Sequence, residues 1–224
     1  MTGSRDVDDL SLSSLGEAAI LCQLPEGSLN FDRQRRIWAL AESAEALPGV
    51  VEVVPGMNNL LVLHDPFTLS HAALSELLLG LWAKASYKDC AGSVTEIPTS
   101  YGGKAGEDLP EIAARAGLTP EEFVALHAAG DYVVYALGSQ PGFAYLGGLD
   151  PRLATPRRSV PRPLLEAGCV IIGGEQTAVQ SRTSPSGWNV IGKTDIEFFD
   201  ATKAVPALLS PGSRLRFVVK EIVL

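Results

Sequence analysis

The sequence predicts an α+β fold in which a ferredoxin-like α/β domain over residues 15–98 precedes a β-barrel or sandwich domain over residues 99–224. Two observations support this prediction. Strand and helix patterns alternate regularly in the first half, whereas short apolar runs between Gly, Pro and Ser clusters fill the second half. Residues 1–14, which carry several acidic side chains, are expected to form a flexible N-terminus.

The first domain is expected to follow the order β-α-β-β-α-β, the ferredoxin-like arrangement. Asn30 is a good N-cap for the first helix, and Gly49 follows that helix as a stop signal. Turn residues at 55–59 join the second and third strands as a hairpin. The expected strands are residues 18–24, 50–54, 60–64 and 94–98, and the expected helices are residues 30–47 and 70–85.

Two short helices are expected at the start of the second domain. Capping-box patterns begin at Asp108 and at Thr119, and Gly117 and Gly130 close the two helices. We interpret both helices as scaffold. The apolar runs that follow have the spacing of a β-barrel or a sandwich, and they cover residues 132–137, 170–172, 177–180, 189–191, 196–199 and 215–219.

Composition excludes several classes of function. The formal net charge of −8 argues against a nucleic-acid partner, because phosphate binding needs a basic stripe. No apolar run approaches the roughly 20 residues of a membrane span, and the first residues lack the apolar core of a signal peptide. We therefore expect a cytoplasmic protein without membrane contact. The cysteines and histidines are isolated in sequence, which predicts buried free thiols and no metal site.

Residues 187–194 match the P-loop pattern G-x-x-x-x-G-K-[ST]. A P-loop follows a buried strand and opens directly into a helix, so that backbone N–H groups point at the phosphates. Here a polar turn precedes the pattern, and strand-forming residues lie within it and after it. We interpret this segment as strand, turn and strand, with Lys193 at a loop tip either as an anion contact or as a solvated lysine.

Arginines gather in a segment without acidic residues, residues 151–165. It carries Arg152, Arg157, Arg158 and Arg162. Arginines in a proline-stiffened loop offer preorganised bidentate donors to carboxylate or phosphate, and a solvated loop is the alternative.

A glycine-rich segment, residues 141–148, precedes the arginines. Gly142, Gly147 and Gly148 allow a close backbone approach or a positive φ. The segment therefore either lines a ligand site or forms barrel corners.

These motifs resemble the allophanate hydrolase subunit 1 family, which includes the B subunit of 5-oxoprolinase and the sporulation kinase inhibitor KipI. The resemblance implies that the second domain is a cyclophilin-like β-barrel. The matching residues run along almost the whole chain: Tyr101-Gly-Gly, Asp108-Leu, Pro141-Gly-Phe-x-Tyr-Leu-Gly-Gly-Leu, Pro156-Arg, Arg162, Gly168, Gln176-Thr177, Ser184-Pro and Gly187-Trp-x-x-Ile-Gly-Lys-Thr.

The resemblance also implies a component of an ATP-dependent amide hydrolase that opens 5-oxoproline to glutamate. Its partners would be subunit 2, which is a KipA-like protein or the C subunit of 5-oxoprolinase, and a third protein that is similar to the A subunit. ATP, with Mg as its companion ion, would be shared with a partner. No Ser–His, Cys–His or paired-carboxylate pattern is visible, so the isolated chain is expected to be inactive.

Under this interpretation Lys193 and Gln176 are the candidate catalytic residues. Lys193 would offset developing phosphate charge together with an arginine, and Gln176 would orient the amide. The candidate residues for binding substrate or ATP are Pro141, Gly142, Phe143, Tyr145, Gly147, Gly148, Arg157, Arg158, Thr177 and Thr194.

The alternative hypothesis is a KipI-like binding module that inhibits a sensor histidine kinase. An exposed apolar patch around Phe143, Tyr145 and Leu146 would serve that role without any catalytic residue. The motifs are common to both hypotheses. Clustered glycines and anion-binding side chains favour the hypothesis of an enzyme component over that of a kinase inhibitor.

Overall fold

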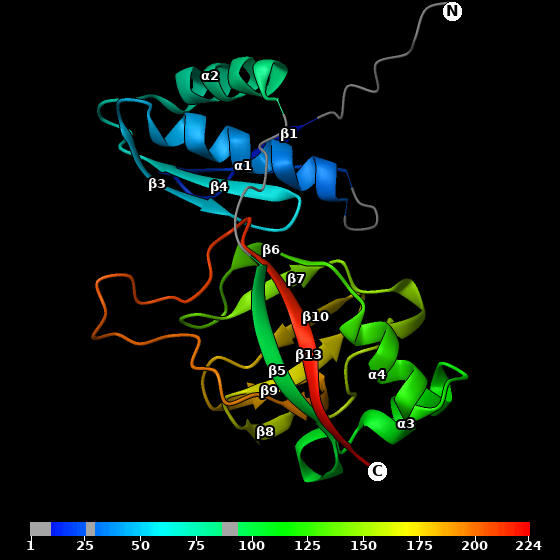
Figure 1. The fold of residues 1–224 in the computed structure, drawn as a ribbon. Helices are drawn as coiled ribbons and strands as arrows, with labels where there is room; N and C mark the ends of the chain where they lie inside the picture. The colour runs from blue at the N-terminus through cyan, green and yellow to red at the C-terminus, as the bar shows by residue number, and fades with distance from the viewer. Residues whose placement is uncertain (1–9, 26–29, 87–93) are drawn as a thin grey trace, which may run out of the picture. The chain divides into compact units, whose positions relative to one another are not determined.

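The structure, a computed structural model, describes residues 10–25, 30–86 and 94–224 (Figure 1). The chain divides into two compact units, residues 1–89 and residues 90–224. The boundary that we expected after residue 98 therefore lies earlier, ahead of the strand that begins at Val94. Among the described residues, no helix is both long enough and apolar enough to cross a membrane.

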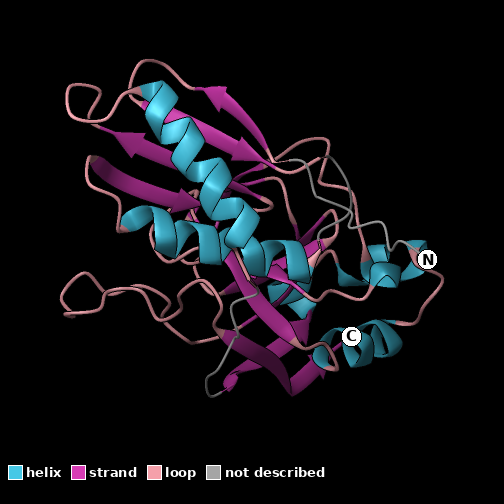
Figure 2. Cartoon of the chain, turned by 90° about the horizontal axis from the view of Figure 1, so that it is seen from above, coloured by secondary structure: helices cyan, strands magenta, loops and turns pink. Residues whose placement is uncertain are grey.

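The first unit is a four-stranded antiparallel sheet with two helices over one of its faces (Figures 1 and 2). The strand order is β1-β2-β4-β3. In chain order the elements are β1 (Ser11–Ser14), β2 (Ala19–Gln23), α1 (Phe31–Glu45), β3 (Val50–Pro55), β4 (Asn59–His64) and α2 (His71–Lys84).

Local signals fix both helices of this unit. The Asn30 side chain accepts a hydrogen bond from the Arg33 backbone N–H, and the Ser70 hydroxyl accepts one from the Ala73 N–H. The N-cap predicted at Asn30 is confirmed, and Ser70, at the start of the expected helix 70–85, caps the second helix. The apolar faces of the helices pack on the inner face of the sheet, and the core includes Ile20, Leu40, Leu60, Val62, Leu74 and Leu78.

The prediction that residues 94–98 complete this sheet is wrong. In a ferredoxin-like order, a strand after the second helix occupies the edge beside the first strand. Here β1 occupies that edge and pairs with β2, with Ser14 opposite Ile20. Residues 11–14 are therefore a paired strand rather than part of a flexible N-terminus, and residues 1–9 lie outside the described residues.

The second unit is built on a closed barrel with the strand order β10-β7-β6-β13-β5-β12-β9. A small two-stranded sheet, β8 with β11, lies outside that order. The elements are β5 (Val94–Gly102), η1 (Gly103–Gly106), α3 (Leu109–Arg115), α4 (Pro120–Ala128), β6 (Tyr132–Leu137), β7 (Ala144–Gly147), η2 (Pro151–Leu153), β8 (Arg162–Leu165), β9 (Cys169–Gly173), β10 (Gln176–Val179), β11 (Ser184–Ser186), β12 (Asn189–Lys193) and β13 (Arg214–Val223).

The first and last strands of the unit close the barrel together. β5 and β13 run parallel along their whole length, from Arg214 opposite Val94 to Val223 opposite Gly102 (Figure 1). Because β5 is needed for this closure, it cannot also be an edge strand of the first sheet. The predicted barrel is thereby confirmed, and the sandwich alternative is excluded.

The expected strand at residues 196–199 is absent. This stretch belongs to the long connection between β12 and β13, which makes only an isolated bridge, Phe199 with Ala207 (orange in Figure 1). The alternating pattern arises because Phe198 is buried while Glu197 is exposed. In the closed barrel each strand already has a neighbour on both sides, so no ladder position remains for this segment.

A polar network centred on His127 is enclosed in the barrel core. Tyr101 Oη lies 2.8 Å from His127 Nδ1, and Thr177 Oγ1 lies 2.9 Å from His127 Nε2. The Thr177 hydroxyl donates to the Ile171 carbonyl at 3.0 Å, so its oxygen accepts from Nε2–H and the tyrosine donates to Nδ1. Burial lowers the pKa of His127 to about 3, so the ring is neutral. His127 is therefore a structural residue of the barrel core.

Candidate functional site

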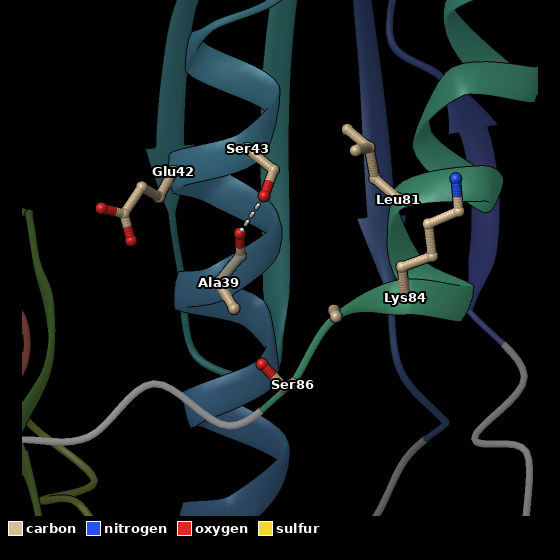
Figure 3. A pocket seen from close by; sticks show the side chains of 7 residues that line it. Ala39, Glu42, Ser43, Leu81, Lys84 and Ser86 are labelled. Atoms are coloured by element: carbon tan, nitrogen blue, oxygen red, sulfur yellow. Dashed lines mark hydrogen bonds between the residues drawn. The ribbon is translucent and has the colours of Figure 1, made fainter.

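One hollow in the first unit lies between the two helices, with a volume of about 530 Å³ (Figure 3). It is lined by Ala39, Glu42 and Ser43 of α1, by Leu81 and Lys84 of α2, and by Ala85 and Ser86 after α2. The Ser43 hydroxyl donates to the carbonyl of Ala39 in its own helix, so it is not directed at a ligand (Figure 3). The barrel unit, in contrast, brings aromatic and charged side chains together in one pocket, and the candidate site lies there.

A pocket of about 300 Å³ in the barrel unit brings together several of the predicted site residues. We call it the aromatic–arginine pocket. It is lined by Ser139, Gln140, Phe143, Tyr145, Arg157, Arg158, Pro161, Gln180, Ser184, Pro185, Ser186, Gly187 and Trp188. Four of the predicted binding residues, Phe143, Tyr145, Arg157 and Arg158, are therefore neighbours in space.

Three aromatic rings form one wall of this pocket. The Phe143 ring centroid lies 4.9 Å from that of Tyr145 and 6.0 Å from that of Trp188, both with edge-to-face geometry. The Arg157 guanidinium lies over the Trp188 ring, 5.4 Å from its centroid. Sequence reasoning did not identify Trp188 as a site residue, although it lies inside the conspicuous 187–194 motif.

Backbone and side-chain hydrogen bonds fix the arginine loop against the segment before β12. The Arg158 N–H donates to the Gly187 carbonyl at 2.7 Å. The Asn189 side-chain amide donates to the Pro156 carbonyl at 2.9 Å. The solvated-loop alternative therefore does not describe residues 156–158, because their main chain is tied to the barrel wall.

Asp108 anchors the same loop through two ion pairs. Its Oδ1 accepts from Arg158 Nη1 at 2.9 Å and from Arg162 Nη2 at 2.8 Å, while Oδ2 accepts from the Val190 N–H at 2.7 Å. The Asp108 side chain is only 7% exposed. The hydrogen bond to Asp108, aided by Glu107, raises the pKa of Arg162 above its usual range.

The predicted capping box at Asp108 is therefore wrong. Asp108 precedes α3, but its side chain makes no capping hydrogen bond, because the carboxylate faces the arginines and β12. Thr119 and Glu122 do form the capping box predicted for α4. Asp108, interpreted as scaffold, is the most important residue that sequence reasoning missed at this site.

A second pocket, of about 360 Å³, contains Lys193. We call it the lysine pocket. It is lined by Lys104, Ala105, Glu107, Arg162, Leu164, Leu165, Glu166, Cys169, Val190 and Lys193. Lys193 is the last residue of β12 rather than a loop tip, and its ammonium pairs with the Glu166 carboxylate. This hydrogen bond raises the pKa of Lys193, and burial raises the pKa of the Cys169 thiol.

The 187–194 motif does not form a phosphate cradle. Residues 189–193 are strand β12, which pairs with β9 and β5 in the barrel. The motif's second glycine, Gly192, lies opposite Tyr101 in that ladder. The strand within the motif is confirmed in place of a P-loop, whereas the turn expected at Gly192 and Lys193 is wrong, because both residues belong to β12.

The three glycines of residues 141–148 pack against the chain itself. A Cβ on Gly142 would lie 2.7 Å from Phe199 Cβ, and one on Gly147 would lie 2.2 Å from the Tyr135 ring. At Gly148, where φ is +102°, a Cβ would lie 2.3 Å from the Asp131 carbonyl oxygen. Of the two alternatives, these contacts favour barrel packing over close approach to a ligand.

We predict that Gly148→Ala lowers the free energy of unfolding by about 2–4 kcal/mol, because it combines a positive φ with a backbone clash. Gly174→Ala is the matched control. Gly174 also has a positive φ, but no atom lies within 4 Å of its Cβ position, so only about 1 kcal/mol of backbone strain is expected. Urea unfolding measures both values, and equal losses would contradict the packing role of Gly148.

The remaining predicted residues line neither pocket. Gln176 and Thr177 are buried in β10, and Thr177 is occupied by the His127 network. Thr194 is buried, with its N–H bonded to the Gly168 carbonyl. Pro141 is exposed, and its carbonyl accepts from the Ser181 hydroxyl at 2.8 Å. The structure thus separates the predicted residues into the aromatic–arginine pocket, the lysine pocket and the barrel wall.

Other predicted features can be placed as well. Cys22 and Cys169 are buried free thiols, as predicted, and Cys90 lies outside the described residues. In the described part of the chain, no three His, Cys, Asp or Glu side chains converge in a way that could hold a metal.

The α/β unit and the closed barrel define a carboxyltransferase-type fold. The urea amidolyase structure of Kluyveromyces lactis superimposes with a TM-score of 0.78 over 95% of this chain and 15% of that one, at 20% identity, which shows the fold alone. The model of the family described as carboxyltransferase domain, subdomain C and D, matches residues 10–209, and the chain belongs to this family.

Curated relatives align along nearly the whole chain. The B subunit of 5-oxoprolinase from Haemophilus influenzae is 41% identical, with 95% of this chain and 99% of that protein covered. The proteins of the same name from Escherichia coli O157:H7 and Bacillus subtilis are 43% and 35% identical, covering 92% of this chain in each case and 94% and 91% of those proteins. The chain is thus homologous to the B subunit of 5-oxoprolinase.

Two further solved structures are similar. The structure of TTHA0988 is 39% identical with a TM-score of 0.77, and the alignment covers 91% of this chain. This chain spans only 40% of that one. A conserved uncharacterized protein of Pyrococcus horikoshii is 34% identical with a TM-score of 0.57, covering 94% of this chain and 98% of that one.

Proposed function

We propose that this chain is one component of an ATP-dependent 5-oxoprolinase, which opens the lactam ring of 5-oxoproline to glutamate. The proposal rests on three relatives named as the B subunit of 5-oxoprolinase, each 35% or more identical over 92% or more of the chain. The aromatic–arginine pocket supports it, because apolar rings beside fixed cationic donors suit a small anionic amide.

ATP, with Mg as its companion ion, is shared with a partner protein in this proposal. A lactam is a stable amide, and ATP would supply the driving force for opening it. The described residues offer no phosphate cradle of the P-loop type, because residues 189–193 of the 187–194 motif form a ladder strand. A cytoplasmic location is proposed because ATP is available there.

The chemical step also requires partners, which we propose are proteins similar to the C and A subunits of 5-oxoprolinase. Among the described residues, His127 is enclosed in the barrel core and bonded on both ring nitrogens. Cys169 is buried, and its pKa is raised rather than lowered. Neither side chain can act as a base or nucleophile toward a ligand in the aromatic–arginine pocket.

The test is co-purification of the chain with both partner proteins, followed by measurement of glutamate formed from 5-oxoproline and ATP. The complete complex is expected to form glutamate, and the chain alone is expected to form none. Absence of glutamate from a folded complex that contains all three proteins would refute the proposal.

A substitution of Lys193 tests whether this candidate catalytic residue offsets developing phosphate charge. We predict that Lys193→Ala lowers kcat at least about tenfold, because the ammonium would offset negative charge in the transition state. Its ion pair with Glu166 is exposed, so the thermal midpoint should not change. Lys104→Ala is the control, since it removes another cation from the same pocket. Unchanged kcat in Lys193→Ala would remove Lys193 from the reaction.

The kinase-inhibitor hypothesis receives less support from the structure. It requires an exposed apolar patch, but Phe143 is 5% exposed and Leu146 is 1% exposed. Addition of the isolated chain to a sensor histidine kinase is therefore expected to leave the rate of autophosphorylation unchanged.

A further inference from the structure

Each of the two arginines that pair with Asp108 has a buried nitrogen without a hydrogen-bond partner. Arg158 Nε and Arg162 Nη1 are buried and have no partner among the described residues. A buried donor without a partner costs free energy, so each such atom needs an explanation, for example a bound ligand. Both arginines share Oδ1 of Asp108 but line different pockets, Arg158 the aromatic–arginine pocket and Arg162 the lysine pocket.

The way in which Asp108 binds Arg158 leaves one edge of the guanidinium unused. Asp108 accepts from Nη1 alone. A guanidinium presents a second edge, Nε with Nη2, whose two parallel N–H groups match the two oxygens of a carboxylate. Because the Arg158 backbone is also tied to Gly187, neither the loop nor the side chain has to be ordered when a ligand binds.

We propose that Arg158 binds the carboxylate of the lactam substrate through its Nε–Nη2 edge and that Asp108 is the positioning residue for this arginine. This inference rests on the proposed function and deepens it. The ligand class is a small cyclic amide that carries a carboxylate. Its ring would lie against the wall formed by Phe143, Tyr145 and Trp188. Arg157 is held over Trp188 and adds positive charge at the rim of the same pocket.

Asp108 acts in this proposal through orientation. Its carboxylate fixes Arg158, Arg162 and the Val190 N–H at once, so that the loop, β12 and the pocket wall share one anchor. Asp108→Asn keeps the shape and one acceptor oxygen but loses the charge that aligns the two guanidinium groups. It should therefore weaken binding of the substrate carboxylate while the chain remains folded.

The first experiment measures KM and kcat for 5-oxoproline with the assembled complex. Arg158→Gln is expected to raise KM about 10- to 100-fold with kcat changed less than about threefold, since a charge-assisted bidentate pair is lost. Asp108→Asn should raise KM in the same way by about 5- to 20-fold. Arg158→Lys should recover only part of the loss, because a lysine keeps the charge without the fork.

An arginine outside both pockets serves as the control. Arg152→Gln removes an exposed arginine paired with Asp150, and it is expected to change KM less than about twofold. An unchanged KM in folded Arg158→Gln, or an equal rise in Arg152→Gln, would overturn the proposal.

The second experiment separates this proposal from the proposed function. Calorimetry measures binding to the full chain of 5-oxoproline and of 2-pyrrolidinone, the same lactam ring without the carboxylate. Arg158→Gln should abolish the preference for 5-oxoproline. If that preference disappears in Arg158→Gln but the complex forms no glutamate, the carboxylate site stands and the 5-oxoprolinase function fails. If glutamate forms and the preference is the same in Arg158→Gln, the carboxylate site fails and the function stands.

Discussion

His127→Ala is expected to lower the free energy of unfolding by about 3–5 kcal/mol. The substitution opens a cavity in the barrel core where the His127 ring now lies 4.5 Å from the Phe217 ring, centroid to centroid. It also leaves the Tyr101 hydroxyl without its acceptor and deprives the Thr177 oxygen of a donor. Urea unfolding followed by circular dichroism measures the loss.

Conservative variants divide this effect into parts. Tyr101→Phe removes the donor to Nδ1, whereas Thr177→Val removes both the acceptor of Nε2–H and the donor to the Ile171 carbonyl. Each leaves at least one group of the His127 ring unpaired and is expected to cost about 1–3 kcal/mol. Losses below about 0.5 kcal/mol in both variants would show that the network is not part of the stability of the core.

The same histidine gives the stability a pH dependence whose sign follows from burial. Its pKa falls from 6.5 in the unfolded chain to about 3 in the barrel. The contribution of His127 to the free energy of unfolding is therefore complete above pH 6.5. It is lost as the pH falls toward 3, because the unfolded chain then binds a proton that the folded chain does not. The slope is on the order of 1 kcal/mol per pH unit.

A variant without the titrating ring isolates this slope from other groups. His127→Gln should show a smaller loss of stability than the natural sequence between about pH 6.5 and about pH 5, a range chosen to lie above most carboxyl pKa values. Parallel curves for the two proteins would mean that His127 accepts a proton in the folded state.

The parts of the fold that sequence could predict are those specified by nearby residues. Asn30 and Ser70 cap their helices through atoms three residues away, and Thr119 with Glu122 completes a capping box over the same distance. The partners of β5 could not be predicted in this way. The alternation of apolar and polar residues in β5 would suit the edge of the first sheet as well as the barrel. Only the parallel pairing with β13, at the far end of the chain, places β5 in the barrel.

At the candidate site, too, the sequence predicts only those features that nearby residues specify. Arg157 and Arg158 could be identified from their proline-rich, acid-free segment, because charge and loop chemistry are local properties. Asp108 could not, since the atoms that its carboxylate binds belong to residues 50 and 82 positions away. Lys193 was identified from a motif, but its partner Glu166 lies 27 positions earlier, and no pattern links the two.

Asp108→Leu is expected to destabilise the barrel unit by about 3–5 kcal/mol, which is typical when one member of a buried ion pair is removed. Arg162 is only 15% exposed and would lose its buried partner, while the Val190 N–H would lose its acceptor. Thermal and urea unfolding of the full chain measure the loss. A change below about 1 kcal/mol would contradict the role of Asp108 as an anchor.

A triple variant distinguishes charge from packing. In Asp108→Leu with Arg158→Met and Arg162→Met, no buried charge of this network is left unpaired, and most of the stability should return, because apolar replacement of a buried ion network is often neutral. The Val190 N–H would still cost about 1–3 kcal/mol. A triple variant as unstable as Asp108→Leu would instead assign the loss to packing. A return of stability would mean that the ion network of Asp108, Arg158 and Arg162 adds little net stability to the barrel unit.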